Sequence, residues 1–142
     1  MTQVPVRERI LVVEDDPEMA ELLKIRLSSA GFQVHTEGRG LPALDYAEKN
    51  ELDLAILDLK LPDIHGYEVC KRLRLLCNPK FLPVIMLTGM DRPMDQLRGF
   101  SYGADAYLVK PYHWAELLKM IEMFLGYQDA GGTEDPGGLI NP

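Results

Sequence analysis

The stretch LDLAILDLKLPDIHG, residues 52–66, decides the fold of this chain. Within it, Leu54–Leu57 is a short apolar run ahead of Pro62 and Gly66, which is typical of a strand buried on both faces. Asp58 follows that run directly, so its carboxylate lies where a buried strand ends. Strand ends of this kind form the ligand-binding edge of open α/β sheets. Because an aspartate here is also typical of a turn, the other strand ends decide between the two interpretations.

The composition is that of one ordinary globular domain. The chain has 142 residues, of which 46% are hydrophobic and 26% are charged. This length and hydrophobic content are sufficient to form a buried core. Its net charge of −7 argues against a broad surface for nucleic acid or anionic membranes, so we expect no direct nucleic acid binding and no membrane association. The N-terminus lacks an apolar stretch of signal-peptide length, and we expect a cytoplasmic protein. The two cysteines, Cys70 and Cys77, are expected to be buried free thiols.

Predicted strands and helices alternate along the chain. Apolar runs predict strands over residues 9–14, 32–36, 54–57, 83–88 and 105–109. Helical spacing predicts helices over residues 17–30, 41–50, 67–77, 93–102 and 113–125, with Asp16 capping the first. This alternation predicts a doubly wound α/β fold, in which helices cover both faces of one five-stranded parallel sheet. Residues 127–142 are rich in Gly and Pro and are predicted to be a tail or linker.

Polar residues follow the predicted strands. If the strands are parallel, one edge of the sheet gathers the polar residues at the carboxyl ends of the first, third, fourth and fifth strands, namely Glu14, Asp15, Asp16, Asp58, Thr88 and Lys110. Crowded carboxylates repel one another unless a cation compensates them, and Mg²⁺ typically binds one or two carboxylates together with a phosphate oxygen. Asp15 and Asp58 suit that ion, while Thr88 and Lys110 would bind the other phosphoryl oxygens. The predicted chemistry is self-phosphorylation of Asp58.

The motifs LVVEDD, DLKLPDIHG, LTG and GADAYLVKP, in this order, resemble the receiver domain of two-component response regulators, the CheY-like superfamily. The resemblance implies a flavodoxin-like (βα)5 fold with strand order 2-1-3-4-5, occupying residues 1–126. It also implies that Asp58 accepts a phosphoryl group from a sensor histidine kinase or phosphotransfer protein, with Mg²⁺ as cofactor. Asp15, Asp58 and the backbone carbonyl of Lys60 would bind the ion directly. Glu14 stands where many relatives carry Asp and would act through metal-bound water.

The same resemblance implies a conformational switch. Thr88 would donate its hydroxyl to the phosphoryl group and Lys110 would pair with it, while Tyr107 would turn inward. The surface of helix 93–102, strand 105–109 and the last helix would change as a result. We expect this surface to bind a downstream target or the chain's own output domain, or to form a homodimer.

Three apolar residues of the last helix, Met120, Met123 and Phe124, fall outside its predicted core face. A partner surface and coverage by the tail both explain this strip. Members of the family with winged-helix DNA-binding domains usually carry an acid and arginines at the charged dimer interface. This chain has Ala106 and Lys119 at those places, which argues against that dimer and that output.

Other functions share parts of this pattern. A haloacid-dehalogenase-like phosphatase needs a second acid two residues after the nucleophile, where this chain has Lys60. A flavin or dinucleotide carrier needs a glycine-rich loop after the first strand, where EDDPE is acidic. A receiver that only docks, without phosphorylation, would not need the complete set of site residues. Within the family, the alternative is the N-terminal receiver of a larger regulator with a DNA-binding or enzymatic output domain.

Overall fold

The computed structural model describes residues 7–76, 82–89 and 103–126. The chain divides into two compact units, Met1–Pro111 and Tyr112–Pro142, and each is described by itself. The predicted helix over residues 93–102, the predicted tail over 127–142 and Cys77 lie outside the described residues.

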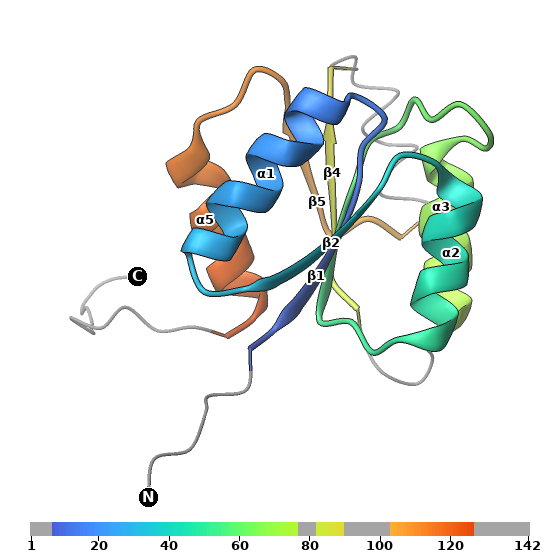
Figure 1. Cartoon of the computed structure of the whole chain (residues 1–142), viewed down its shortest axis with the longest axis horizontal. Helices are drawn as coiled ribbons and strands as arrows, with labels where there is room; N and C mark the ends of the chain where they lie inside the picture. Colours follow the sequence, from blue (N-terminus) through green and yellow to red (C-terminus); the bar gives the residue numbers. More distant parts are fainter. Residues whose placement is uncertain (1–6, 77–81, 90–102, 127–142) are drawn as a thin grey trace, which may run out of the picture. The chain divides into compact units, whose positions relative to one another are not determined.

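The first unit is built on a five-stranded parallel sheet with strand order β2-β1-β3-β4-β5 (Figure 1). The strands are β1 (Arg9–Val13), β2 (Gln33–Glu37), β3 (Leu54–Leu57), β4 (Val84–Thr88) and β5 (Ala106–Val109). The predicted α/β fold and strand order are therefore confirmed, and each strand lies within one residue of its predicted bounds.

Three helices of this unit follow the first three strands. They are α1 (Pro17–Ser29), α2 (Gly40–Lys49) and α3 (Gly66–Leu76). Figure 1 shows α2 and α3 side by side on one face of the sheet and α1 on the opposite face. This arrangement is the expected result of crossovers that wind to both sides of a parallel sheet.

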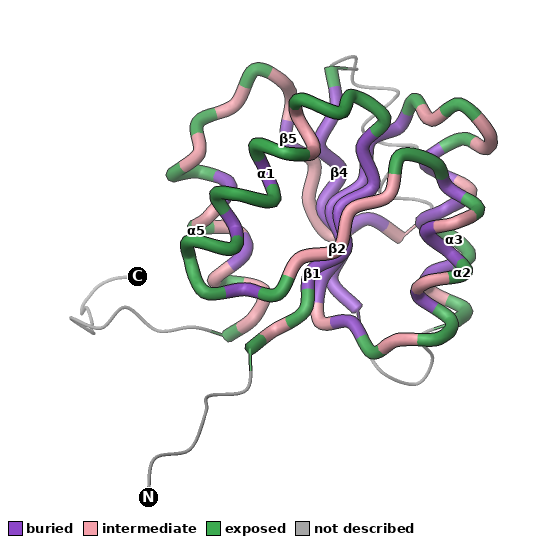
Figure 2. Tube along the Cα trace, in the orientation of Figure 1, coloured by how far each residue is buried: buried purple, intermediate pink, exposed green. Residues whose placement is uncertain are grey.

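The strands alternate between two apolar layers because successive side chains point to opposite faces of a sheet. In β1, Leu11 and Val13 belong to the core cluster shared with α2 and α3, while Ile10 and Val12 are buried outside that cluster. All residues of β3 and β4 are buried, whereas β2 at the sheet edge is mostly half-buried (Figure 2). The central strands therefore give the polar residues at their ends fixed positions.

The turn from β1 to α1 is closed by a helix cap. The side chain of Asp16 accepts a hydrogen bond of 3.0 Å from the backbone N–H of Glu18, and Pro17 occupies the first turn. This satisfies a donor that the helix itself leaves unpaired. The predicted capping role of Asp16 is present in the structure, and the cap holds the acidic turn that contains Glu14 and Asp15.

The second unit contains the helix α5 (Trp114–Phe124), whose buried residues are Leu117 and Ile121. In the predicted strip, Met123 is 66% exposed, and Met120 and Phe124 are half-buried. Its role as a partner surface stays a prediction. No helix among the described residues combines the length and the apolar character needed to cross a membrane.

Candidate functional site

Strand register brings the predicted site residues together. Val13 of β1 pairs with Leu57 of β3, so the next residues, Glu14 and Asp58, are neighbours at the carboxyl edge of the sheet. The N–H of Asp58 donates to the carbonyl of Val13 at 3.0 Å, which holds this register beyond the last pair. Two buried strands therefore deliver two carboxyl groups to one place.

The same edge receives residues from β4 and β5. Thr88 pairs with Val109, so Lys110 directly follows the pair, and its N–H donates to the carbonyl of Thr88 at 2.8 Å. A cavity of about 420 Å³ opens among the ends of these strands. Its lining residues are Glu14, Asp15, Asp16, Asp58, Lys60, Thr88, Gly89 and Lys110.

Three acids of this cavity are close enough to share one cation. Glu14, Asp15 and Asp58 each offer a carboxylate oxygen, and these oxygens lie within 4.8 Å of one another. Glu14 is only 4% exposed and Asp58 only 8%, whereas Asp15 is exposed. Hard divalent cations prefer such oxygen ligands, and an exposed acid gives an ion access from solvent. The acidic group is therefore chemically fitted to hold Mg²⁺.

Lys110 supplies a positive charge beside two of these acids. Its Nζ lies 2.7 Å from Oε1 of Glu14 and 3.1 Å from Oδ2 of Asp58. Burial by itself would lower the pKa of Lys110, but the hydrogen bonds and charges of Glu14 and Asp58 outweigh it and raise that pKa. Lys110 is therefore fully charged at neutral pH, within reach of any group attached to Asp58.

Glu14 is the most deeply buried acid of the cluster. Burial raises its pKa, and the charge of Asp58 adds to that effect, while the bonds from Lys110 and from the N–H of Asp16 oppose it. Oε2 accepts the N–H of Asp16 at 3.2 Å, so the two carboxylate oxygens face different partners. The direct bond to Lys110 was not part of the predicted water-mediated role of Glu14.

The other predicted site residues occupy defined places. Thr88 is 1% exposed at the end of β4, and Tyr107 is half-buried in β5 and packs against the core cluster. The N–H of Lys60 donates to Oδ1 of Asp58 at 3.3 Å, so the residue predicted to offer a carbonyl to the ion is held beside Asp58.

Gly66 and Asp63, which follow Asp58 in the chain, shape the site, and neither role was predicted from the sequence. A Cβ atom on Gly66 would lie 2.3 Å from the carbonyl oxygen of Asp58, so the start of α3 approaches the β3 end more closely than any side chain permits. Asp63 accepts the backbone N–H groups of Gly40 and Leu41 at 2.8 Å each and thereby caps α2. A glycine at a helix start is only a weak sequence signal of a close backbone approach, so Gly66 was hard to predict. The sequence around α2 contains no signal that its cap comes from Asp63.

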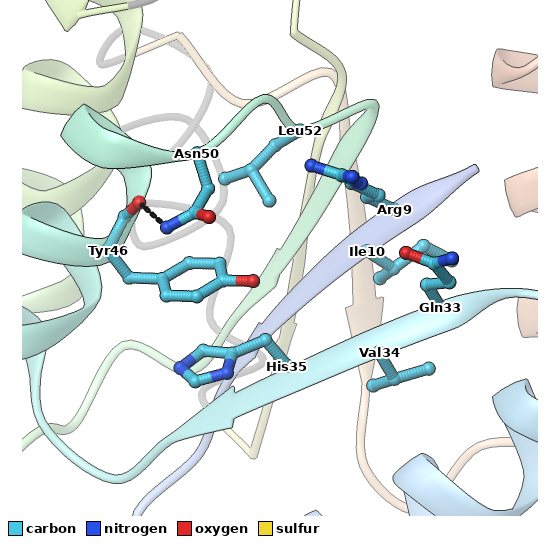
Figure 3. A pocket seen from close by; sticks show the side chains of 8 residues that line it. All are labelled: Arg9, Ile10, Gln33, Val34, His35, Tyr46, Asn50 and Leu52. Carbon is cyan, nitrogen blue, oxygen red and sulfur yellow. Dashed lines mark hydrogen bonds between the residues drawn. The ribbon is translucent and has the colours of Figure 1, made fainter. Parts of the chain in front are cut away.

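A second cavity, of about 240 Å³, lies among residues of β1, β2 and α2 (Figure 3). The ring of His35 stacks on that of Tyr46 with centroids 3.6 Å apart, and its Nε2 lies 2.6 Å from Oε2 of Glu37. The amide of Asn50 donates to the carbonyl of Tyr46 at 2.9 Å, as Figure 3 shows. These contacts use the ring and amide groups for packing, so the first cavity is the better candidate site.

Comparison with known proteins identifies the family. The family model for the response regulator receiver domain matches residues 10–122. The chain belongs to this receiver domain family. It is 36% identical over 132 residues to the response regulator ArlR of Staphylococcus saprophyticus, covering 93% of this chain and 59% of that protein. It is also 38% identical over 121 residues to the DNA-binding dual master transcriptional regulator RpaA of Synechocystis, covering 85% of this chain and 50% of RpaA.

A solved receiver domain has the same fold. The receiver domain of the sensor histidine kinase PA1611 from Pseudomonas aeruginosa, described with a magnesium ion coordinated in its active site cleft, superposes with a TM-score of 0.78 at 30% identity. The match covers 85% of this chain and 99% of that one. The chain thus spans nearly all of an isolated receiver domain, but only about half to three fifths of the curated regulators it matches.

Proposed function

We propose that this receiver domain accepts a phosphoryl group on Asp58 and passes the signal on through a change of surface. The observation that carries the proposal is the position of Lys110, whose Nζ contacts both Glu14 and Asp58 at a cavity that also contains Thr88. A permanent cation, a buried carboxylate and a hydroxyl at one strand edge match the requirements of phosphoryl transfer to a carboxylate.

In the proposed reaction, a carboxylate oxygen of Asp58 attacks the phosphorus of a phosphohistidine on a histidine kinase or phosphotransfer protein. A P–O bond forms and the N–P bond breaks, and the electron pair of that bond stays with the imidazole nitrogen. Lys110 would then form an ion pair with the phosphoryl group, and Thr88 would donate its hydroxyl to a phosphoryl oxygen. The reaction is a self-modification, and this domain would turn over no other substrate.

Asp15, Asp58 and the carbonyl of Lys60 would hold Mg²⁺ directly, and Glu14 would hold it through water. The ion would neutralise charge that develops on the phosphoryl oxygens. The acidic group within 4.8 Å supports this assignment, as does the magnesium ion named for the PA1611 receiver.

The proposed output is a protein interaction. Phosphorylation adds about −1.5 to −2 charge units at Asp58, and the response of Thr88 would let Tyr107 turn inward and change the adjoining surface. Residues 1–126 would form the receiver, and 127–142 a tail or a linker to an output domain. RpaA is named as a DNA-binding protein and this chain covers 50% of it, which supports the alternative of a receiver joined to a DNA-binding output domain. Ala106 and Lys119 argue against an output of the winged-helix type, and this stays a prediction.

Phosphorylation of the whole chain by acetyl phosphate and Mg²⁺, followed by peptide mass spectrometry, tests the proposal. We expect one phosphoryl group, located on Asp58, and none in Asp58→Asn. An unmodified Asp58 under conditions that phosphorylate a reference receiver domain would favour the docking-only alternative.

Alanine at Met120 and Met123 tests whether these residues form a partner surface. That role is excluded if every phosphorylation-dependent association survives the substitutions.

A further inference from the structure

The loop between β3 and α3 is held at both its base and its tip. At the base, the N–H of Gly66 donates to the carbonyl of Leu59 at 2.8 Å. At the tip, Asp63 contacts the first turn of α2, which lies 22 and 23 residues earlier in the chain. Lys60 lies between these two points.

The contact at the tip accounts for the first turn of α2. Oδ1 of Asp63 accepts the N–H of Gly40 and Oδ2 that of Leu41, both at 2.8 Å. Pro42 has no N–H, and Ala43 already donates to the carbonyl of Arg39 at 3.3 Å. Arg39, at the capping position, makes no side-chain cap bond. Asp63, which is distant in the sequence, therefore caps α2 in place of the residue at the capping position.

An apolar contact reinforces this polar one. A Cβ atom on Gly40 would lie 2.7 Å from Cγ1 of Ile64 and 2.7 Å from Cγ2 of Val69, so the loop tip and α3 rest directly on the glycine backbone. Oδ1 of Asp63 also accepts the N–H of Ile64 at 2.8 Å, which fixes the loop backbone next to this contact.

We infer that Asp63 is a positioning residue for the Mg²⁺ site, because it ties the loop that carries Lys60 to the first turn of α2. The inference rests on the proposed function, in which the Lys60 carbonyl binds the ion. Mg²⁺ requires near-ideal octahedral geometry, so a ligand on a loop that pivots about its base would bind it less well. Substitution of a residue that orients a metal ligand typically lowers metal affinity by about 10–100-fold.

The test uses the full chain and measures Mg²⁺ binding by isothermal titration calorimetry without a phosphodonor. In parallel, it measures the initial rate of Asp58 phosphorylation by acetyl phosphate against Mg²⁺ concentration, so the half-saturating concentration is obtained in two ways. For Asp63→Ala we expect the half-saturating Mg²⁺ concentration to rise about tenfold, while the rate at saturating Mg²⁺ stays within about twofold of wild type. Asp63→Asn keeps the Oδ1 acceptor, so it should recover part of the affinity. The control, Asp45→Ala, removes an exposed acid of α2 that pairs with Lys49 and should change neither quantity.

A residue that merely caps α2 would lower stability without moving the half-saturating concentration. An unchanged half-saturating concentration in Asp63→Ala, or a loss confined to the saturated rate, overturns the inference. If Asp63→Ala does not fold, Asp63→Asn takes its place, because it loses the carboxylate oxygen that accepts the N–H of Leu41, and an unchanged Mg²⁺ requirement there overturns the inference equally. A wild type that accepts no phosphoryl group removes the proposed function, whereas the calorimetric titration still tests the inference, which distinguishes the two failures.

Discussion

At the residue scale, the site depends on the pairing of one lysine with two nearly buried acids. Lys110 lies between Glu14 and Asp58 and partly neutralises two carboxyl groups that are almost fully buried. Buried charges of this kind are stable only when they are paired. The strand-end pattern predicted that Lys110 and Asp58 would meet, and they do so at 3.1 Å. It did not predict the 2.7 Å bond to Glu14, because side-chain length alone does not show which partner is reached.

We predict that Lys110→Met destabilises the protein by about 1–3 kcal/mol in Mg²⁺-free urea unfolding at pH 7, because two acids lose their counter-charge. The raised pKa means that this contribution is complete below the ordinary value of 10.5 and is lost as pH rises through the higher folded value. The control, Lys49→Met, removes an exposed pair and should cost little. Equal stability of Lys110→Met and wild type at pH 7 would contradict the prediction.

A second residue-scale prediction concerns Cys70, whose thiol is buried in α3. Burial raises its pKa to about 11, so on the order of 0.1% is thiolate at pH 8 in the folded protein. In a Cys77→Ser background, we expect a thiol reagent to label Cys70 slowly in buffer and rapidly in urea. Labelling in buffer at the rate of a free cysteine would show that the thiol is accessible.

At the element scale, helices and strands were predicted well where the signals are local. Apolar runs located β3 and β4, and Asp16 with Pro17 marked the start of α1. The start of α2 had no such signal, since its cap comes from Asp63 on another element. Contacts of this kind depend on tertiary structure, so spacing along the chain cannot reveal them.

Replacing Gly66 with Ala is predicted to destabilise the protein by about 1–3 kcal/mol, although alanine favours helices. The added Cβ would lie 2.3 Å from the carbonyl oxygen of Asp58 and 2.7 Å from Cα of Leu59, so backbone atoms would have to move. At Gly38 the nearest atom to an added Cβ is 3.9 Å away, so Gly38→Ala is the matched control. Urea unfolding compares the two, and a neutral Gly66→Ala would be inconsistent with this close approach.

The cap on α2 should also depend on pH. Although desolvation acts to raise the pKa of Asp63, the backbone N–H groups of Leu41, Gly40 and Ile64 together outweigh it and lower that pKa. Its stabilisation is therefore present above the ordinary value of 3.8 and disappears as pH falls through the lower folded value. We expect the stability difference between wild type and Asp63→Ala to be greatest near neutral pH and to shrink below about pH 4. A difference that stays constant down to pH 2 would show that the carboxylate charge is not involved.

At the scale of the whole molecule, the family and the sheet order were both predictable, because four motifs and four strand ends agree with one another. Agreement across levels of this kind is what allows a sequence to specify one fold. This chain covers 59% of ArlR and 50% of RpaA, so the output of the whole protein is a proposal.

Mg²⁺ should stabilise the folded chain as a whole, since the acidic group exists only when β1 and β3 are paired. At about 100 times its dissociation constant, the ion is expected to add about 2.7 kcal/mol to the free energy of unfolding, and EDTA should remove that gain. Asp15→Asn should abolish most of the effect. A Mg²⁺-independent unfolding midpoint in wild type, measured at constant ionic strength, would argue against the site.

The order in which the site residues occur along the chain has a consequence for biosynthesis. A ribosome releases the three acids and Thr88 first, and Lys110 of the fifth strand's end emerges last among the residues that line the cavity. A nascent polypeptide that stops after β4 would present carboxylates without their ammonium neighbour. Under the proposed function, competence to receive a phosphoryl group would therefore arise only after nearly the whole sheet has been translated.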